Sequence, residues 1–160
     1  MTASDPAKVD ARQVALARYR PGRAADYRAW GWPVTLHHDR IWLTLHDHAV
    51  ALIIPTDLAL DVTRILTDRR CSPAVLAHPY LPHHQIVLGG EPYGVPLPLP
   101  PGVHRATGML PLPPTRTPRG PLTWMHPPEP NALHLCREID IFGALHTLGK
   151  GRRRAMRSVI

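Results

Sequence analysis

Apolar residues recur along the chain at two different spacings, and the change between them separates expected helices from expected strands. In residues 6–20 and 24–30 the spacing is close to that of a helix, and Gly31 follows the second segment, as glycine commonly follows a helix end. After Gly31 the period falls to two. The β-rich runs "WPVTLHH", "RIWLTLH" and "AVALIIP" are joined only by "HD" and "DH", which predicts a meander of three antiparallel strands. The third run contains no polar residue, so we expect a central strand buried on both faces.

The helical period returns twice further along the chain. Residues 57–70 carry an apolar stripe at i, i+4, i+7 and i+8 (Leu58, Val62, Ile65 and Leu66), with Thr56 as the expected cap. Residues 132–148 predict a last helix that is capped by Asn131 and closes at Gly149, with Leu135, Ile139, Phe142 and His146 on one face.

Between these two helices, "SPAVLAHP" and "HHQIVLGG" predict two further strands. Residues 79–130 then contain 15 prolines, which allow only edge strands and extended segments. The order of elements predicts an α+β fold, a mostly antiparallel sheet with helices packed on it. We expect one domain over residues 1–148 and a basic, disordered tail over residues 149–160.

The charge of the chain is concentrated in that tail. The formal net charge is +7, and "GKGRRRAMR" holds five basic residues and no acid: Lys150, Arg152, Arg153, Arg154 and Arg157. Two interpretations stay open. A block of like charges is typically a solvated, disordered tail, and basic charge also attracts phosphate backbones without sequence preference. No apolar run reaches the roughly 18 residues of a membrane span, so we expect a cytoplasmic protein in which Cys71 and Cys136 are free thiols.

Three groups of residues are candidates for ligand sites. The histidine clusters His37–His38 and His46–His48 lie at successive joints of the expected meander, at opposite ends of its strands, so they are too far apart to share a metal ion. Glu138 and Asp140 point apart on a helix, which favours a solvated face. Gly89–Gly90 is a lone pair that favours a turn over a phosphate loop. The sequence therefore predicts no metal site, and the role of the histidine clusters stays open.

Two stretches of the chain carry a likeness to a known family. "AADYRAWGWPV" is an Ala-rich helix that leads into Gly-Trp-Pro-Val, and "LPPTRTPRGPLTW" is a strand ending in Pro113-Pro114-Thr115, a loop with Gly120 and a strand with Trp124. On these residues the chain resembles the bifunctional DNA primase/polymerase (prim-pol) domains of the archaeo-eukaryotic primase superfamily, in particular a divergent branch in actinobacteria. The likeness covers roughly residues 10–148. It implies that the prolines mark edge strands, with Leu112 and Trp124 turned into the core.

The same resemblance implies where catalytic residues would stand. Such domains use two or three acids to hold Mg²⁺, and a histidine beside the nucleotide phosphates. In this chain Pro55 and Asp57 stand at the first acidic pair, His84 or Gln85 at the histidine, and Gly102 near the last acid. One carboxylate of three cannot hold the metals. We therefore expect the chemistry to be lost, Asp57 to be a first-turn helix residue, and Mg²⁺ to be needed only if activity remains.

These observations lead to one expected function and two alternatives. We expect a degenerate primase/polymerase-like domain that acts as a nucleic-acid-binding or accessory module in DNA replication or mobile-element maintenance. DNA would be bound weakly and without sequence preference by the basic tail. The alternatives are an active Mg²⁺-dependent nucleotidyltransferase with displaced acids, and a non-enzymatic interaction domain with an incidental tail. A protein partner or a homodimer stays open, and no membrane contact is expected.

Overall fold

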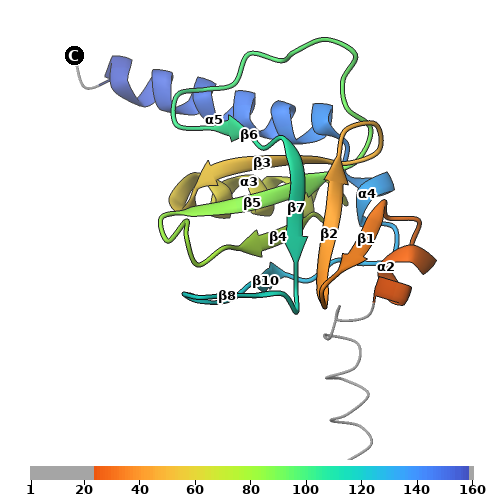
Figure 1. The fold of residues 1–160 in the computed structure, drawn as a ribbon. Helices are drawn as coiled ribbons and strands as arrows, with labels where there is room; N and C mark the ends of the chain where they lie inside the picture. Colours follow the sequence, from red (N-terminus) through yellow and green to blue (C-terminus); the bar gives the residue numbers. More distant parts are fainter. Residues whose placement is uncertain (1–23, 159–160) are drawn as a thin grey trace, which may run out of the picture.

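A computed structural model describes residues 24–158, which form an α+β fold (Figure 1). Residues 1–23 and 159–160, and with them the helix predicted over residues 6–20, lie outside the described residues. The elements in chain order are α2 (Ala24–Ala29), β1 (Val34–His37), β2 (Arg40–Leu45), β3 (Val50–Pro55), α3 (Thr56–Asp68), β4 (Ala74–Ala77), β5 (His84–Gly89), β6 (His104–Arg105), β7 (Gly108–Leu112), β8 (Arg116–Thr117), β9 (Gly120–Pro121), β10 (Thr123–His126), α4 (Ala132–Leu135) and α5 (Glu138–Ser158).

The strands form two main sheets, and the predicted meander is divided between them. β1 and β2 pair as a hairpin whose turn residues, His38 and Asp39, both have positive φ, as the favoured two-residue hairpin turn requires. The helix before it ends as expected, with Gly31 at a φ of 79°. The expectation that β3 continues this meander is wrong. β2 pairs instead with β7, and β3 belongs to a second sheet in the order β10-β4-β5-β3-β6.

The five-stranded sheet is antiparallel throughout, and its strands follow the sequence patterns. β3 lies between β5 and β6, and four of its six residues are buried, so the interior strand predicted from the run "AVALIIP" is confirmed. The proline-rich part of the chain supplies β6, β7 and β10, and each of these strands lies at a sheet edge. The expectation that residues 79–130 would form only edge strands and extended segments holds for the residues after β5, because proline cannot donate to a central ladder. It is wrong for β5, which lies within this range and is an interior strand between β4 and β3.

Two cores lie on the two faces of the five-stranded sheet. One face packs against α3 and α5, with Leu52, Ile54 and Val87 from the sheet. The other face packs against α2 and the three-stranded sheet, where Tyr27 stacks on Trp32 at 5.1 Å between ring centroids. As expected, Leu112 is fully buried. Trp124 is half-buried and packs edge-on against Trp32, so the prediction that it is buried holds only in part.

Helix α3 follows its predicted apolar stripe but begins one residue earlier than predicted. Leu58, Val62 and Leu66 are buried, and Ile65 is partly buried. The helix begins at Thr56, and Pro55 stands at the N-cap position without a side-chain hydrogen bond to the helix. The prediction that Thr56 caps the helix is therefore wrong by one residue, because the chain passes directly from β3 into the helix.

The last predicted helix is interrupted near its start and runs past its predicted end. It is divided into α4 and α5, because Cys136 has extended backbone angles. The break changes which residues face inward. Leu135 and His146 are exposed, whereas Ile141 and Leu145 are buried. Helix α5 continues beyond Gly149 to Ser158, so residues 149–158, which were expected to belong to a disordered tail, are helical in this structure.

Candidate functional site

The three positions that the prim-pol resemblance singled out lie together at one end of the five-stranded sheet. β3 ends at Pro55, which pairs with His84 of β5, and Asp57 lies in the first turn of α3. Gly102 is adjacent, because a Cβ placed on it would lie 3.5 Å from the Cγ of Pro55. We call this place, defined by Pro55, Asp57, His84 and Gly102, the β3 corner.

The β3 corner contains one carboxylate. Asp57 is exposed, in the first-turn position predicted for it, where the helix dipole stabilises an acid. Within residues 24–158, no three His, Cys, Asp or Glu side chains are placed so that they could hold a metal ion. Mg²⁺ prefers carboxylate oxygens and phosphates as ligands, and the corner offers it a single such side chain. Among the three positions, Asp57 alone supplies a carboxylate.

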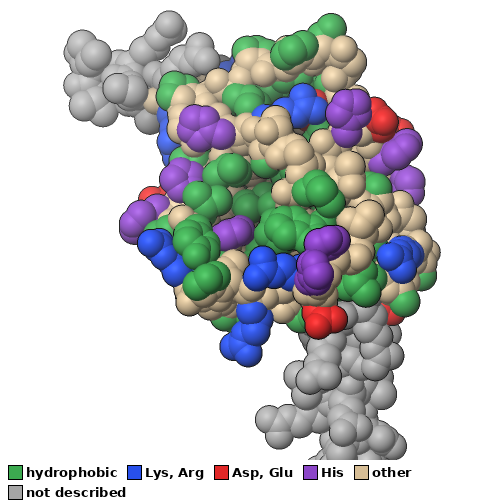
Figure 2. Space-filling model, viewed as in Figure 1, with side chains coloured by type: hydrophobic (Ala, Val, Ile, Leu, Met, Phe, Trp, Pro, Cys, Tyr) green, Lys and Arg blue, Asp and Glu red, His purple; other side chains and the backbone are tan. Residues whose placement is uncertain are grey.

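A row of histidines lies on the sheet face that extends from the corner. His104 of β6 is the cross-strand partner of Ile53, which in turn is the partner of Ile86. His84 lies two residues before Ile86, so its side chain is on the same face. Burial lowers the pKa of His78, which follows β4. Figure 2 shows this face, over β3, β5 and β4, as a hollow with a hydrophobic floor and a rim of histidine and Lys or Arg side chains.

Beside this face, the β8–β9 hairpin contributes a cation. The guanidinium of Arg119 lies over the ring of Tyr80, 4.7 Å from its centroid, and Tyr80 also contacts His78 edge-on at 5.7 Å. Tyr80 is exposed. A cation over an aromatic ring is a stabilising contact, and this one holds the hairpin against the loop between β4 and β5. The result is a positively charged rim that the sequence patterns did not reveal, because its members are 39 residues apart in the chain.

Helix α5 carries the basic residues predicted to bind nucleic acid. After Asp140 the described helix contains no acidic residue, and Lys150 and Arg152 are exposed. Arg153, Arg154 and Arg157 follow in the same helix. Figure 1 shows that the end of α5 extends past the edge of the sheet, on the side where β3 ends. The helix dipole favours cations near a helix C-terminus, and the basic residues of this sequence lie at that end of α5.

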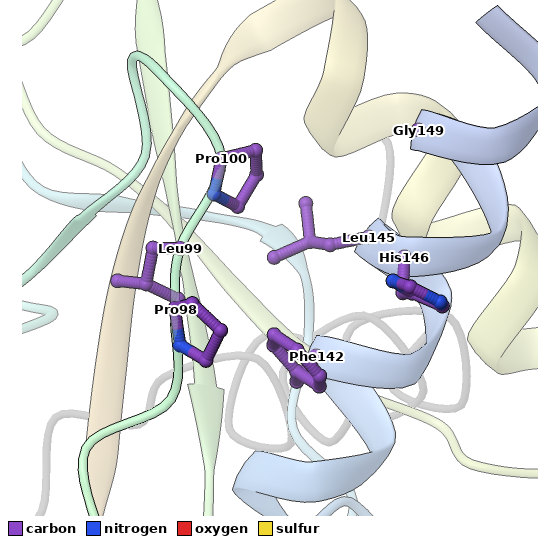
Figure 3. Close-up of a pocket in the computed structure, with 7 residues that line it drawn as sticks. All are labelled: Pro98, Leu99, Pro100, Phe142, Leu145, His146 and Gly149. Atoms are coloured by element: carbon purple, nitrogen blue, oxygen red, sulfur yellow. The ribbon is translucent and has the colours of Figure 1, made fainter. Parts of the chain in front are cut away.

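A pocket of about 370 Å³ separates α5 from the proline-rich loop that leads to β6. Figure 3 shows Pro98, Leu99 and Pro100 on the loop, opposite Phe142 and His146 of the helix, with Leu145 between them. Sequence reasoning missed this pocket. The helical pattern predicted Phe142 and His146 on one face of the helix, and nothing in it indicated that the loop would lie along the helix. The spacing of Phe142, Leu145, His146 and Gly149 at i, i+3, i+4 and i+7 was the only signal available.

The other candidate ligand residues differ in burial. The histidines of both clusters, His37–His38 and His46–His48, are exposed. Glu138 was expected on a solvated face, and this is wrong, because it is buried. Its Oε1 accepts a hydrogen bond from the Tyr93 backbone N–H at 2.9 Å, and its Oε2 lies 3.3 Å from Arg105 Nη2. Glu138 therefore has a structural role at the start of α5.

Comparisons of the chain with protein-family models, with curated proteins and with solved structures found no match. Among residues 24–158, no helix has both the length and the apolar character that crossing a bilayer would require.

Proposed function

We propose that this protein is a nucleic-acid-binding accessory domain with a primase/polymerase-like arrangement of elements, and that it does not carry out nucleotidyl transfer. The observation that carries the proposal is the end of α5. It is a helix that extends past the sheet and has only basic charged residues after Asp140. Phosphate backbones attract such charge regardless of sequence, and DNA replication or mobile-element maintenance is the proposed context.

The expected strength of binding follows from the number of cations. If Lys150, Arg152 and the three arginines that follow contact three to four phosphates, log K falls with log salt at a slope of about −3. Contacts of this kind give dissociation constants on the order of 10⁻⁴–10⁻⁶ M at physiological salt.

The second half of the proposal, that catalysis is lost, is supported by the β3 corner. Phosphoryl transfer depends on metal ions that neutralise the charge developing on the phosphate oxygens. Of the three positions that meet at the corner, only Asp57 has a carboxylate, and the other two are His84 and Gly102. With a single carboxylate, the corner is not suited to holding the metal ions that phosphoryl transfer requires.

The test is fluorescence anisotropy with a labelled DNA duplex of about 20 base pairs. Binding is measured between about 50 and 200 mM salt, a range over which the slope of log K against log salt is resolved. Changing Arg152, Arg153 and Arg154 together to Gln should weaken binding and bring the slope close to zero. The matched control changes Arg28, Arg64 and Arg70 to Gln. All three are exposed, and the variant has the same net charge, so it should bind almost as the unchanged protein does. Equal losses in both variants, or no binding at 50 mM salt, would overturn the proposal.

The catalytic half has its own test. Primer extension with Mg²⁺ or Mn²⁺ should show no nucleotide incorporation. Incorporation that disappears in Asp57→Ala would show that the protein is an active nucleotidyltransferase whose remaining acids lie elsewhere.

A further inference from the structure

The pocket between α5 and the proline-rich loop lies next to the basic end of the helix. Its floor is Leu145, which is buried, and its walls are Phe142 and His146 on one side and Pro98–Pro100 on the other (Figure 3). Its volume of about 370 Å³ is at the lower end of the roughly 300–1,000 Å³ of small-ligand pockets. It therefore suits one compact, mainly apolar group.

The aromatic rings of this pocket favour a flat occupant. The rings of Phe142 and His146 are 6.1 Å apart and only 20° from parallel. They lie one helical turn apart and are stacked, which leaves the outer face of the stack open to a further ring. The other wall consists of proline and leucine side chains, which present apolar surface and no hydrogen-bonding group. A planar ring could lie between the two walls, and the site would not distinguish one ring from another by hydrogen bonds.

The charge around the pocket favours an anion attached to that ring. Lys150 lies four residues after His146, one turn further along the same helix face and about 6 Å along its axis. Arg152 follows two residues later, and both side chains are exposed. None of the residues that line the pocket is a carboxylate.

From these features we infer that the pocket receives an unpaired base of a single-stranded nucleic acid, while Lys150 holds an adjoining phosphate. This inference rests on the proposed function and specifies its substrate. Proteins that bind single strands combine a basic track with aromatic rings on which bases stack, and they tolerate many sequences because every base has a π face. A base inside a duplex is stacked on its neighbours and cannot enter the pocket.

The experiment compares a labelled 12-nucleotide single strand with the corresponding duplex by anisotropy, a length within the usual site size of about 4–16 nucleotides. Phe142→Leu removes the ring but keeps an apolar side chain, and His146→Ala removes an exposed ring. Each should weaken single-strand binding by roughly five- to a hundredfold, the usual effect of losing one stacking residue. Duplex binding should hardly change. His134→Ala removes an exposed histidine outside the pocket and is the control.

A second measurement does not depend on the variants folding equally well. A 2-aminopurine base in the single strand should change its fluorescence when the unchanged protein binds, and an abasic site at that position should weaken binding. The inference would be overturned if neither the two substitutions nor the abasic site affected single-strand binding. In that case the proposed function would still stand if binding required Arg152, Arg153 and Arg154. If neither nucleic acid binds, both fail. Binding of an Asp- and Glu-rich peptide with one leucine, dependent on Phe142 and Lys150, would assign the pocket to a protein partner.

Discussion

Gly90 offers the sharpest test of how the last two helices are attached to the sheet. It is buried just after β5, and its backbone bridges to the segment between α4 and α5. Its N–H donates to the Cys136 carbonyl at 2.7 Å, and its carbonyl accepts from the Glu138 N–H at 3.0 Å. A Cβ added to Gly90 would lie 1.8 Å from the carbonyl oxygen of Leu133. Since that neighbour is backbone, it cannot rotate away.

Gly90→Ala therefore forces α4 away from β5. The displacement breaks two backbone hydrogen bonds, each worth about 0.5–1.5 kcal/mol, and adds about 1–3 kcal/mol of overpacking. The sum is about 2–6 kcal/mol, a large part of the 5–15 kcal/mol that is typical of a domain. With a denaturant dependence of about 2 kcal/mol per molar urea, a loss near the middle of this range lowers the urea midpoint by about 2 M.

The assay is urea unfolding followed by tryptophan fluorescence, with Gly94→Ala as the matched control. Gly94 is exposed, and a Cβ placed on it would meet nothing within 4 Å, so its substitution should change the stability by no more than about 0.5 kcal/mol. If both variants unfold at the same urea concentration, the close approach of β5 and α4 is wrong.

Two further predictions concern buried polar groups. Tyr27→Phe removes a buried hydroxyl that donates to the Pro113 carbonyl at 2.9 Å, so the free energy of unfolding should fall by about 1–3 kcal/mol in the same assay, and an unchanged value would contradict this bond. Burial raises the pKa of Cys136 to about 12. A thiol reagent such as DTNB at pH 8 should therefore label only the half-buried Cys71 until urea is added. Rapid labelling of two thiols in the folded protein would contradict the burial of Cys136.

The sequence predicts well those elements whose hydrophobic pattern depends only on which of their own residues are buried. β3 and β5 are continuous apolar runs because both of their faces are covered. The prolines that follow β5 confine the later strands β6, β7 and β10 to sheet edges. These features depend on residues close together in the chain. The α+β class followed from them without knowledge of any distant contact.

Other features depend on contacts between residues that are far apart in the chain, and the sequence pattern did not reveal these contacts. The joint His46–His48 reads as a hairpin turn, yet β2 pairs with β7, more than 60 residues away, so β3 is free to enter the other sheet. The helical pattern is continuous through Cys136, but the bridge to Gly90 interrupts the helix there. Because Leu135 lies before the interruption and His146 after it, the two no longer belong to one continuous helical face, and both are exposed.

The direction of α5 is fixed at its start, far from its basic end. Glu138 is the first residue of the helix, and it is held by three partners: the Gly90 carbonyl, the Tyr93 N–H and the Arg105 guanidinium. An acid at a helix N-terminus also interacts favourably with the helix dipole. Because an α-helix is a rigid element that advances 1.5 Å per residue, this attachment determines where Lys150 lies, about 18 Å along the axis. The proposed interface thus owes its position to a buried carboxylate that need not touch the nucleic acid itself.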